Sequence, residues 1–167
     1  MRLAALALIF AAVFAPLSAR ADVASAGPTG FVIQAEADVT AGPDQVWRRL
    51  TRIQNWWSDG HTYSGDASNL SLQPRAGGCW CERWGSGQSV EHGRVALVME
   101  NAGVRTLRIN AALGPLQEMG ANGVLTFTVA PLASGAKLTM TYRVAGDAGL
   151  ALDQAAALVD MVMMEQF

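Results

Sequence analysis

The feature that most constrains the fold of this chain is a series of short alternating segments between residues 70 and 145. Apolar and polar side chains alternate in segments such as VLTFTVAPL and AKLTMTYRVAG, as in strands that bury one face. Turn signals such as GSGQ, NAG and ASG separate consecutive segments, which predicts about six strands joined by sequential antiparallel hairpins. The side chains predicted to face the core late in the chain are Leu125, Phe127, Val129, Leu138, Met140, Tyr142 and Val144.

Segments on either side of this series have other patterns. FVIQAEADV, residues 31–39, alternates as one more strand, and TAGPDQVWRRLTRIQNWW takes a helical period from Gly42 and Pro43 onward. GLALDQAAALVDMVMMEQF, at the end of the chain, predicts a long helix. The predicted fold class is α+β, with two short helices after the first strand and a curved antiparallel sheet wrapped around the C-terminal helix. The apolar stripe of that helix comprises Leu152, Ala155, Ala156, Val159, Val162 and Met163.

Residues 1–21 are predicted to be a secretory signal peptide. Arg2 precedes LAALALIFAAVFAPL, an apolar run of about 15 residues where a spanning helix needs about 20. The small residues of SARA place the cleavage before Asp22. We therefore expect a periplasmic or secreted protein, in a compartment that permits disulfides, with no stable membrane insertion once the signal is removed. Residues 22–30 are expected to be a flexible leader, and residues 31–167 one domain.

Charge argues against several classes of partner. The chain has 12 basic and 14 acidic residues, and removal of Arg2 and Arg20 with the signal would make it more acidic still. Such a balance argues against nucleic acid and anionic membranes as partners. The sequence has no Ser-His-Asp order, phosphate-binding glycine loop or nucleotide motif, and no cofactor is predicted.

The stretch AGGCWCERW holds Cys79 and Cys81, the two cysteines of the chain. In an extended strand, residues i and i+2 lie about 6.6 Å apart at Cα, whereas a disulfide needs Cβ atoms about 3.8 Å apart. A bridge therefore requires departure from strand geometry, which Gly77 and Gly78 would permit through a bulge. A zinc site with His61 and His92 has the right ligand number, although the spacing matches no standard zinc pattern. The remaining interpretation is two buried or half-buried thiols.

The alternate residues of the same stretch, Trp80, Glu82 and Trp84, share the other face of the predicted strand. If they point inward, an apolar setting would raise the pKa of Glu82. His92 and Arg94 lie in phase on the following strand, so a polar cluster with Glu82 at one end of a cavity is expected. A structural salt bridge between Glu82 and an arginine on a neighbouring strand is an equal alternative.

Two more segments are candidates for control of access. Aromatic residues gather between the helices and the sheet, where they would act as a gate or as a structural plug: Trp56, Trp57, His61 and Tyr63. GPLQEMG, between two strands, is expected to form a lid-like loop in which Gly114 and Pro115 set a tight turn.

This order of elements resembles the START-like, or SRPBCC, superfamily, which includes polyketide cyclases and lipid-transfer proteins. VTAGPDQVWRRLTRIQNWW is similar to its opening strand-to-helix passage, with a Pro-led helix before a tryptophan-rich corner. HTYSGDASNLSL, AGGCWCE, VEHGRVALV and LRINAALGPLQ resemble blocks of a secreted bacterial subgroup. The resemblance implies a helix-grip fold with an internal cavity for an apolar or amphipathic small molecule.

The function expected from the resemblance and the residues together is binding of an apolar small molecule or lipid, with no indication of oligomeric state. Glu82 and His92 would orient the polar end of the ligand, near Arg94. One alternative is a cyclase or dehydratase that uses Glu82 and His92 as acid and base. Another is a metal or redox protein that uses Cys79 and Cys81. The expected cavity lining is Trp80, Trp84, Phe127, Met140, Tyr142 and Met163.

Overall fold

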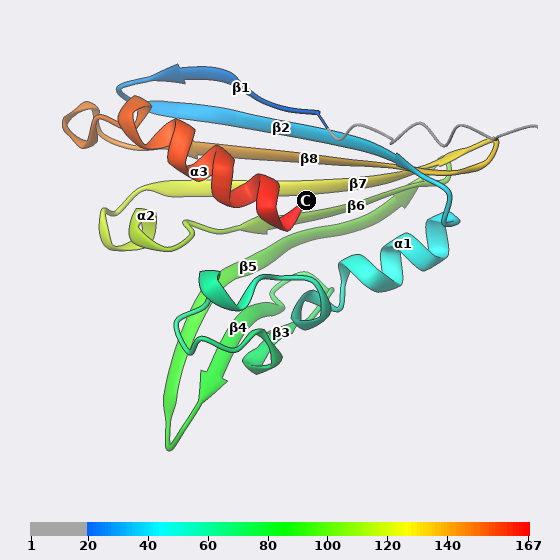
Figure 1. The fold of residues 1–167 in the computed structure, drawn as a ribbon, viewed down its shortest axis with the longest axis horizontal. Coiled ribbons are helices and arrows are strands. Elements are labelled where there is room, and N and C mark those ends of the chain that lie inside the picture. The colour runs from blue at the N-terminus through cyan, green and yellow to red at the C-terminus, as the bar shows by residue number, and fades with distance from the viewer. Residues whose placement is uncertain (1–19) are drawn as a thin grey trace, which may run out of the picture.

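The computed structural model of the protein describes residues 20–167, and its largest element is an eight-stranded antiparallel sheet (Figure 1). The chain leaves the second strand, crosses to the far edge of the sheet, and returns strand by strand until the last strand pairs with the second. This confirms the predicted antiparallel sheet. In spatial order the strands are β1 (Arg20–Gly27), β2 (Gly30–Val39), β8 (Gly135–Ala145), β7 (Asn122–Leu132), β6 (Val104–Asn110), β5 (Gln88–Asn101), β4 (Cys79–Trp84) and β3 (Leu70–Leu72).

Helices lie on one face of the sheet, and the longest is C-terminal, as predicted (Figure 1). The two short helices expected after residues 31–39 correspond to α1 and η1. Within residues 20–167, no helix combines the length and the apolar character that a membrane crossing requires. The helices are α1 (Pro43–Leu50), η1 (Ile53–Asn55), η2 (Asp59–His61), η3 (Ala67–Asn69), α2 (Pro115–Glu118), η4 (Ala148–Leu150) and α3 (Asp153–Gln166).

The core lies between the helices and the inner face of the sheet. The alternation along β2, β7 and β8 is confirmed, since Phe31, Leu125 and Tyr142 and their in-phase neighbours are buried. Leu138 shares that phase but is only half-buried. Its exposure marks a part of the inner face that no helix covers fully.

Helix α3 packs toward one side of the sheet, against β1 and β2 (Figure 1). Its approach is fixed at the N-terminal end, where the Leu152 N–H donates to the Pro28 carbonyl in the β1–β2 turn. Leu152, Ala156 and Met163 of the predicted stripe are buried, whereas Val159 and its neighbours Ala155 and Val162 are half-buried. The stripe is therefore partly turned toward open space and not wholly toward the sheet.

The prediction of a flexible leader at residues 22–30 is wrong. Residues Arg20–Gly27 form β1, which pairs with β2 so that Val23 opposes Ile33 and Ala26 opposes Phe31, and residue 30 begins β2 itself. The pairing depends on backbone donors and acceptors along the edge of β2, which small side chains do not reveal in a sequence. The predicted signal peptide lies, for residues 1–19, outside the described part of the chain.

Strand β5 carries the bend of the sheet. Its first half pairs with β4 and its second half with β6. The pairing with β4 shifts register between Trp80 and Cys81, and the pairing with β6 shifts register between Val95 and Leu97. The two shifts lie on either side of Arg94. An extra residue on one strand of a pair bends that strand and increases its twist. In Figure 1 the β3–β4 end is accordingly turned away from the plane of β6–β8.

Candidate functional site

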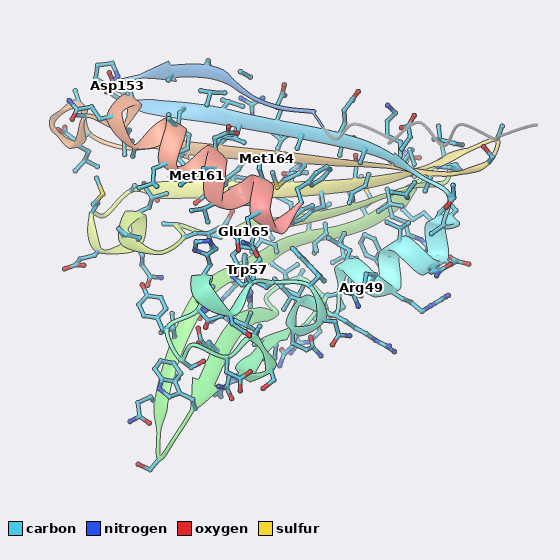
Figure 2. The ribbon with its side chains drawn as sticks, in the orientation of Figure 1. Arg49, Trp57, Asp153, Met161, Met164 and Glu165 are labelled. Atoms are coloured by element: carbon cyan, nitrogen blue, oxygen red, sulfur yellow. A yellow bond between two sulfur atoms is a disulfide. The ribbon has the colours of Figure 1, made fainter. Side chains whose placement is uncertain are left out.

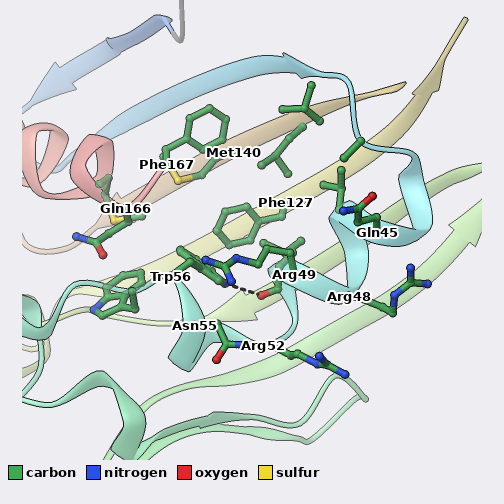
Figure 3. A pocket seen from close by; sticks show the side chains of 17 residues that line it. Gln45, Arg48, Arg49, Arg52, Asn55, Trp56, Phe127, Met140, Gln166 and Phe167 are labelled. Carbon is green, nitrogen blue, oxygen red and sulfur yellow. Dashed lines mark hydrogen bonds between the residues drawn. The ribbon is translucent and has the colours of Figure 1, made fainter. Parts of the chain in front are cut away.

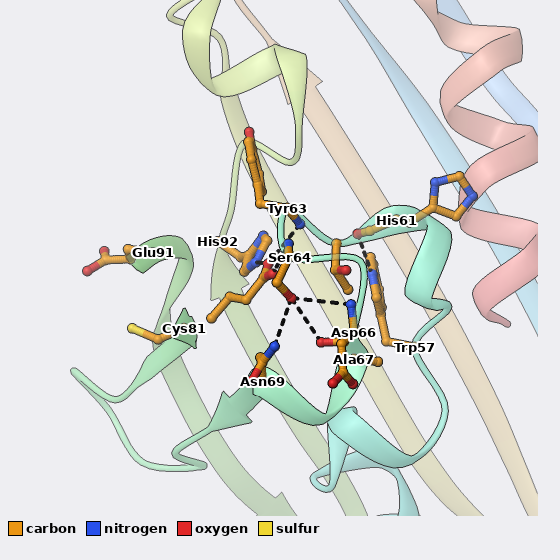
Figure 4. Close-up of polar contacts among 12 residues, drawn as sticks. Trp57, His61, Tyr63, Ser64, Asp66, Ala67, Asn69, Cys81, Glu91 and His92 are labelled. Atoms are coloured by element: carbon orange, nitrogen blue, oxygen red, sulfur yellow. Dashed lines mark hydrogen bonds and ion pairs between the residues drawn. The ribbon is translucent and has the colours of Figure 1, made fainter. Parts of the chain in front are cut away.

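Glu82 is fully buried and holds together a polar cluster whose other members, Tyr63, Ser64 and His92, are labelled in Figure 4. Its carboxylate accepts hydrogen bonds from the backbone N–H groups of Tyr63 at 3.1 Å and Ser64 at 2.5 Å. The same carboxylate lies 2.8 Å from Nε2 of the buried His92. The predicted contact between Glu82 and His92 is therefore present, and it ties β4 and β5 to the loop that follows η2.

Arg94 does not join this cluster. Trp80 opposes Gly93 while Cys81 opposes Glu91, so His92 is the extra residue of a bulge on β5. The bulge changes the phase of the strand, and Arg94 is exposed although His92 is buried. Arg94 pairs instead with Glu91 and donates to the Gly77 carbonyl. The alternative of a Glu82–arginine salt bridge is also wrong, because the partner of Glu82 is a histidine.

The environment of Glu82 has the opposite effect on its pKa from the one expected. Burial alone would raise the pKa, but hydrogen bonds from Ser64, Tyr63 and His92 outweigh it and hold the pKa below its usual value of 4.5. Burial also lowers the pKa of His92 below 6.5, although Glu82 acts in the other direction. At neutral pH a neutral His92 therefore donates its Nε2–H to an ionised Glu82, which leaves Nδ1 as an acceptor.

The two cysteines form a disulfide, which is one of the three interpretations that the sequence left open. Their Cα atoms are 5.4 Å apart, closer than the roughly 6.6 Å of a regular strand. The pairing with β5 also shifts register between Trp80 and Cys81, next to this shortened span. Both cysteines lie on the side of β4 opposite Trp80 and Glu82, and Figure 4 shows Cys81 directed away from His92.

The four residues of the proposed zinc set are not brought together. The disulfide leaves no thiolate to bind a metal, His92 is bonded to Glu82, and His61 pairs with Glu165 at 2.9 Å. Among the described residues, no group of three or more His, Cys, Asp or Glu side chains could hold a metal ion.

A row of aromatic rings packs against the Glu82–His92 pair. Trp57 meets Trp80 edge to face at 4.8 Å between ring centroids, and Trp80 and Tyr63 flank the His92 ring at 5.5 Å and 5.8 Å. Trp80 is fully buried, and its Nε1–H has no hydrogen-bond partner among residues 20–167. Trp80 is thus a packing residue of the core. The expectation that it lines a cavity is wrong. Trp84, half-buried at the end of β4, lines neither of the cavities described below.

The first cavity, here the α1 pocket, has a volume of about 530 Å³ and lies between α1, the inner face of the sheet and the end of α3 (Figure 3). Phe127, Met140 and Met163 line it, as expected. Tyr142 does not, because its hydroxyl is buried between the Ala111 carbonyl and the Leu113 N–H, and burial raises its pKa to about 12. Further apolar lining comes from Val39, Val46, Leu50, Leu138, Trp56, Trp57 and Phe167.

Sequence reasoning missed the polar rim of the α1 pocket. Arg48, Arg49 and Arg52, with Gln45 and Asn55, line its opening. The signal was present in the sequence as RRLTR, three arginines within five residues of an otherwise acidic chain. Because arginine usually lies on solvated helix faces, the run alone does not distinguish a pocket rim from ordinary surface.

The second cavity, here the α2 pocket, has a volume of about 470 Å³ and lies between α2, α3 and the corner at residues 57–63. His92 lines it, whereas Glu82 is enclosed behind His92. The GPLQEMG segment forms α2 and one wall of this pocket, with Leu116 buried and Gln117 donating to the Glu91 carbonyl. Its suggested movement as a lid stays a prediction.

The two pockets meet at Trp57 and Met163, which line both. The end of α3 is fastened to the same corner, because the Ser58 N–H donates to Gln166 at 2.7 Å and His61 pairs with Glu165 (Figure 2). The Trp57 indole N–H in turn donates to the His61 carbonyl at 2.9 Å. The aromatic corner therefore acts as a structural partition between two cavities.

No protein family model and no curated protein matches the chain. Among solved structures, a protein from Rhodobacter sphaeroides has a TM-score of 0.53 at 17% identity, covering 88% of this chain and 93% of its own. A protein from Mesorhizobium loti has a TM-score of 0.52 at 17% identity, with coverages of 81% and 90%. The lipid transfer and protein localization domain of human StarD13 has a TM-score of 0.45 at 15% identity, with coverages of 84% and 79%.

Identities this low bear on the fold alone. The predicted α+β, helix-grip-like arrangement is confirmed, with its curved antiparallel sheet and long C-terminal helix. The resemblance to the START-like superfamily as such stays a prediction, as does the resemblance to a secreted bacterial subgroup.

We expect Glu82→Gln to destabilise the protein far more than Glu91→Gln. The amide can accept at only one atom, so a buried N–H of Tyr63 or Ser64 would face a second donor, at a cost of about 1–3 kcal/mol. Glu91 pairs with Arg94 at the surface, where solvent screening leaves such pairs with little effect on stability. Urea unfolding of the two variants at neutral pH measures the difference. Equal losses would contradict the structural role assigned to Glu82.

Stability should also decrease as the pH falls below about 6.5. The unfolded chain binds protons at His92 near 6.5 and at Glu82 near 4.5, whereas the folded protein binds them only at lower pH. The unfolded state therefore holds more protons in this range. The free energy of unfolding accordingly decreases as the pH is lowered. Urea unfolding at a series of pH values measures the slope. His92→Gln keeps an amide donor without a titrating ring, and an unchanged slope in that variant would show that His92 does not contribute.

Proposed function

We propose that this protein binds an apolar or amphipathic small molecule in the α1 pocket. The observation that carries the proposal is the pocket itself, whose volume of about 530 Å³ falls within the roughly 300–1,000 Å³ of small-molecule sites. Apart from the buried Gln166, its walls are apolar, and its other polar residues are exposed at the rim. This is the arrangement expected for a ligand that buries a hydrophobic body and keeps one polar end near solvent.

The walls of the pocket suit a ligand of variable shape. The sheet supplies Phe127, Leu138 and Met140, and the end of α3 supplies Met163 and Phe167. Methionine is unbranched and polarizable, so it adapts to irregular apolar surfaces. The half-buried Leu138 is an exposed part of an otherwise buried strand face, and a bound apolar group would remove it from water.

Location outside the cytoplasm, in the periplasm or as a secreted protein, is part of the proposal. It rests on the predicted signal peptide and is supported by the disulfide between Cys79 and Cys81, since disulfides persist in oxidising compartments. The net charge of −2 supports a small-molecule partner over nucleic acid.

Leu138→Trp should weaken binding of the neutral apolar probe N-phenyl-1-naphthylamine by about tenfold or more, because the larger ring fills the α1 pocket. Leu132→Trp is the matched control, since Leu132 is exposed at the end of β7 and lines neither pocket. Probe fluorescence under titration measures the affinity of each protein. The proposal fails if the wild-type protein does not bind the probe, or if Leu138→Trp binds it unchanged.

The same titration of Val159→Trp assigns the site. Val159 lines the α2 pocket and not the α1 pocket. Binding lost in Val159→Trp but kept in Leu138→Trp would move the proposed site to the α2 pocket.

A second candidate function uses the α2 pocket. His92 lines this pocket, and it is neutral at neutral pH. Its Nε2–H donates to the ionised Glu82, an arrangement in which a carboxylate orients an imidazole base. Removal of a proton next to a carbonyl, as in cyclase or dehydratase chemistry, is a reaction that such a base serves. We expect the protein to accelerate deuterium incorporation from D2O into an aromatic 1,3-diketone, measured by mass spectrometry. Equal rates with His92→Gln would exclude this function.

A further inference from the structure

The rim of the α1 pocket holds three cationic side chains and no acidic ones. Arg48 and Arg49 lie on α1 and Arg52 follows it, and no Asp or Glu is among the residues that line the pocket. Within residues 20–167, none of these three guanidinium groups has a hydrogen bond or an ion pair. Elsewhere in the same chain Arg94 and Arg105 are both held by carboxylates.

The cationic rim is a local feature. The chain as a whole has a net charge of −2, so an excess of arginine at one pocket does not follow from composition. The α2 pocket has the reverse character, since its lining includes Glu118 and no Arg or Lys. The two cavities therefore differ in charge although both have apolar walls.

The side chain of Arg49 points in a different direction from those of Arg48 and Arg52. Figure 3 shows its side chain extending toward Trp56 and Phe127, whereas Arg48 and Arg52 point away from the pocket. Gln45 lies one helical turn before Arg49, so its amide is on the same face of α1. A guanidinium and an amide thus stand together where the apolar wall ends.

We infer that the ligand of the α1 pocket is an anionic amphiphile, whose apolar body fills the pocket and whose carboxylate or phosphate group pairs with Arg49. The planar guanidinium offers two parallel N–H donors that match the oxygens of either group. Arg48 and Arg52 add positive potential at the opening, which attracts the anion without contacting it. This inference rests on the proposed function and adds the charge and the orientation of the ligand.

The test compares amphiphiles that share one tail. Dodecanoate, dodecyl phosphate and dodecanol would each be titrated, below the concentration at which they aggregate, against protein loaded with N-phenyl-1-naphthylamine. We expect the wild-type protein to bind the two anions about tenfold or more tighter than dodecanol, since charge-assisted pairing discriminates on this scale. Arg49→Gln should remove most of that preference and leave dodecanol binding unchanged.

Arg83→Gln is the matched control. Arg83 is an exposed arginine on β4, lies outside both pockets, and has no carboxylate partner among the described residues. The two variants change the net charge equally, so a loss of preference in Arg49→Gln alone identifies a local contact. A preference for either anion over the other supports the inference and shows which head group fits better.

Three outcomes would overturn the inference. Equal affinity of the wild-type protein for dodecanol and for both anions is the first, and an anion preference that survives in Arg49→Gln is the second. The third is an equal loss of preference in Arg83→Gln. Each of these leaves apolar binding intact and is distinct from failure of the proposed function, in which neither the probe nor any of the three amphiphiles binds.

Discussion

The buried carboxylate of Glu82 is the interaction on which the arrangement of the cavities depends. A carboxylate removed from water is stable only when its oxygens are fully hydrogen-bonded, and Tyr63, Ser64 and His92 supply those bonds. The two backbone donors belong to the segment that follows η2, and this segment has little regular structure of its own. Glu82 therefore holds a loop in place against the sheet and defines one side of the α2 pocket.

The same interaction reaches the α1 pocket through the aromatic corner. Trp57 packs on Trp80, which lies two residues before Glu82 on the same face of β4. The indole N–H of Trp57 also donates to the His61 carbonyl. His61 in turn pairs with Glu165 at the end of α3. A displacement of the loop would thus move the partition between the cavities and release the end of α3. The walls of both pockets therefore depend on the order of the corner.

The course of β7 and β8 could be predicted, because burial of one face imposes a period of two on the sequence. The phase of β4 could not, because both of its faces are buried from Cys79 to Glu82. The position of Arg94 could not, because one extra residue at His92 reverses the phase, and a bulge is set by the pairing of two backbones. The sequence could not decide between a disulfide and two thiols, because closure depends on a local departure from strand geometry. Strand β1 was missed because an edge strand of small residues has little hydrophobic period to detect.

The charge state of Glu82 could not be predicted from the sequence. An inward-facing Glu82 was considered as one possibility, but the direction of its pKa shift depends on donors from Tyr63 and Ser64, about twenty residues away in sequence. An apolar cavity beside such a network has a cost, since its walls lack the dispersion contacts of a filled core. Helix α3 could reduce that cost by covering the centre of the sheet, but its attachment at Pro28 directs it toward β1 and β2. The uncovered face near Leu138 is thus built into the connectivity, and the proposed apolar ligand would restore the contacts that the helix does not make.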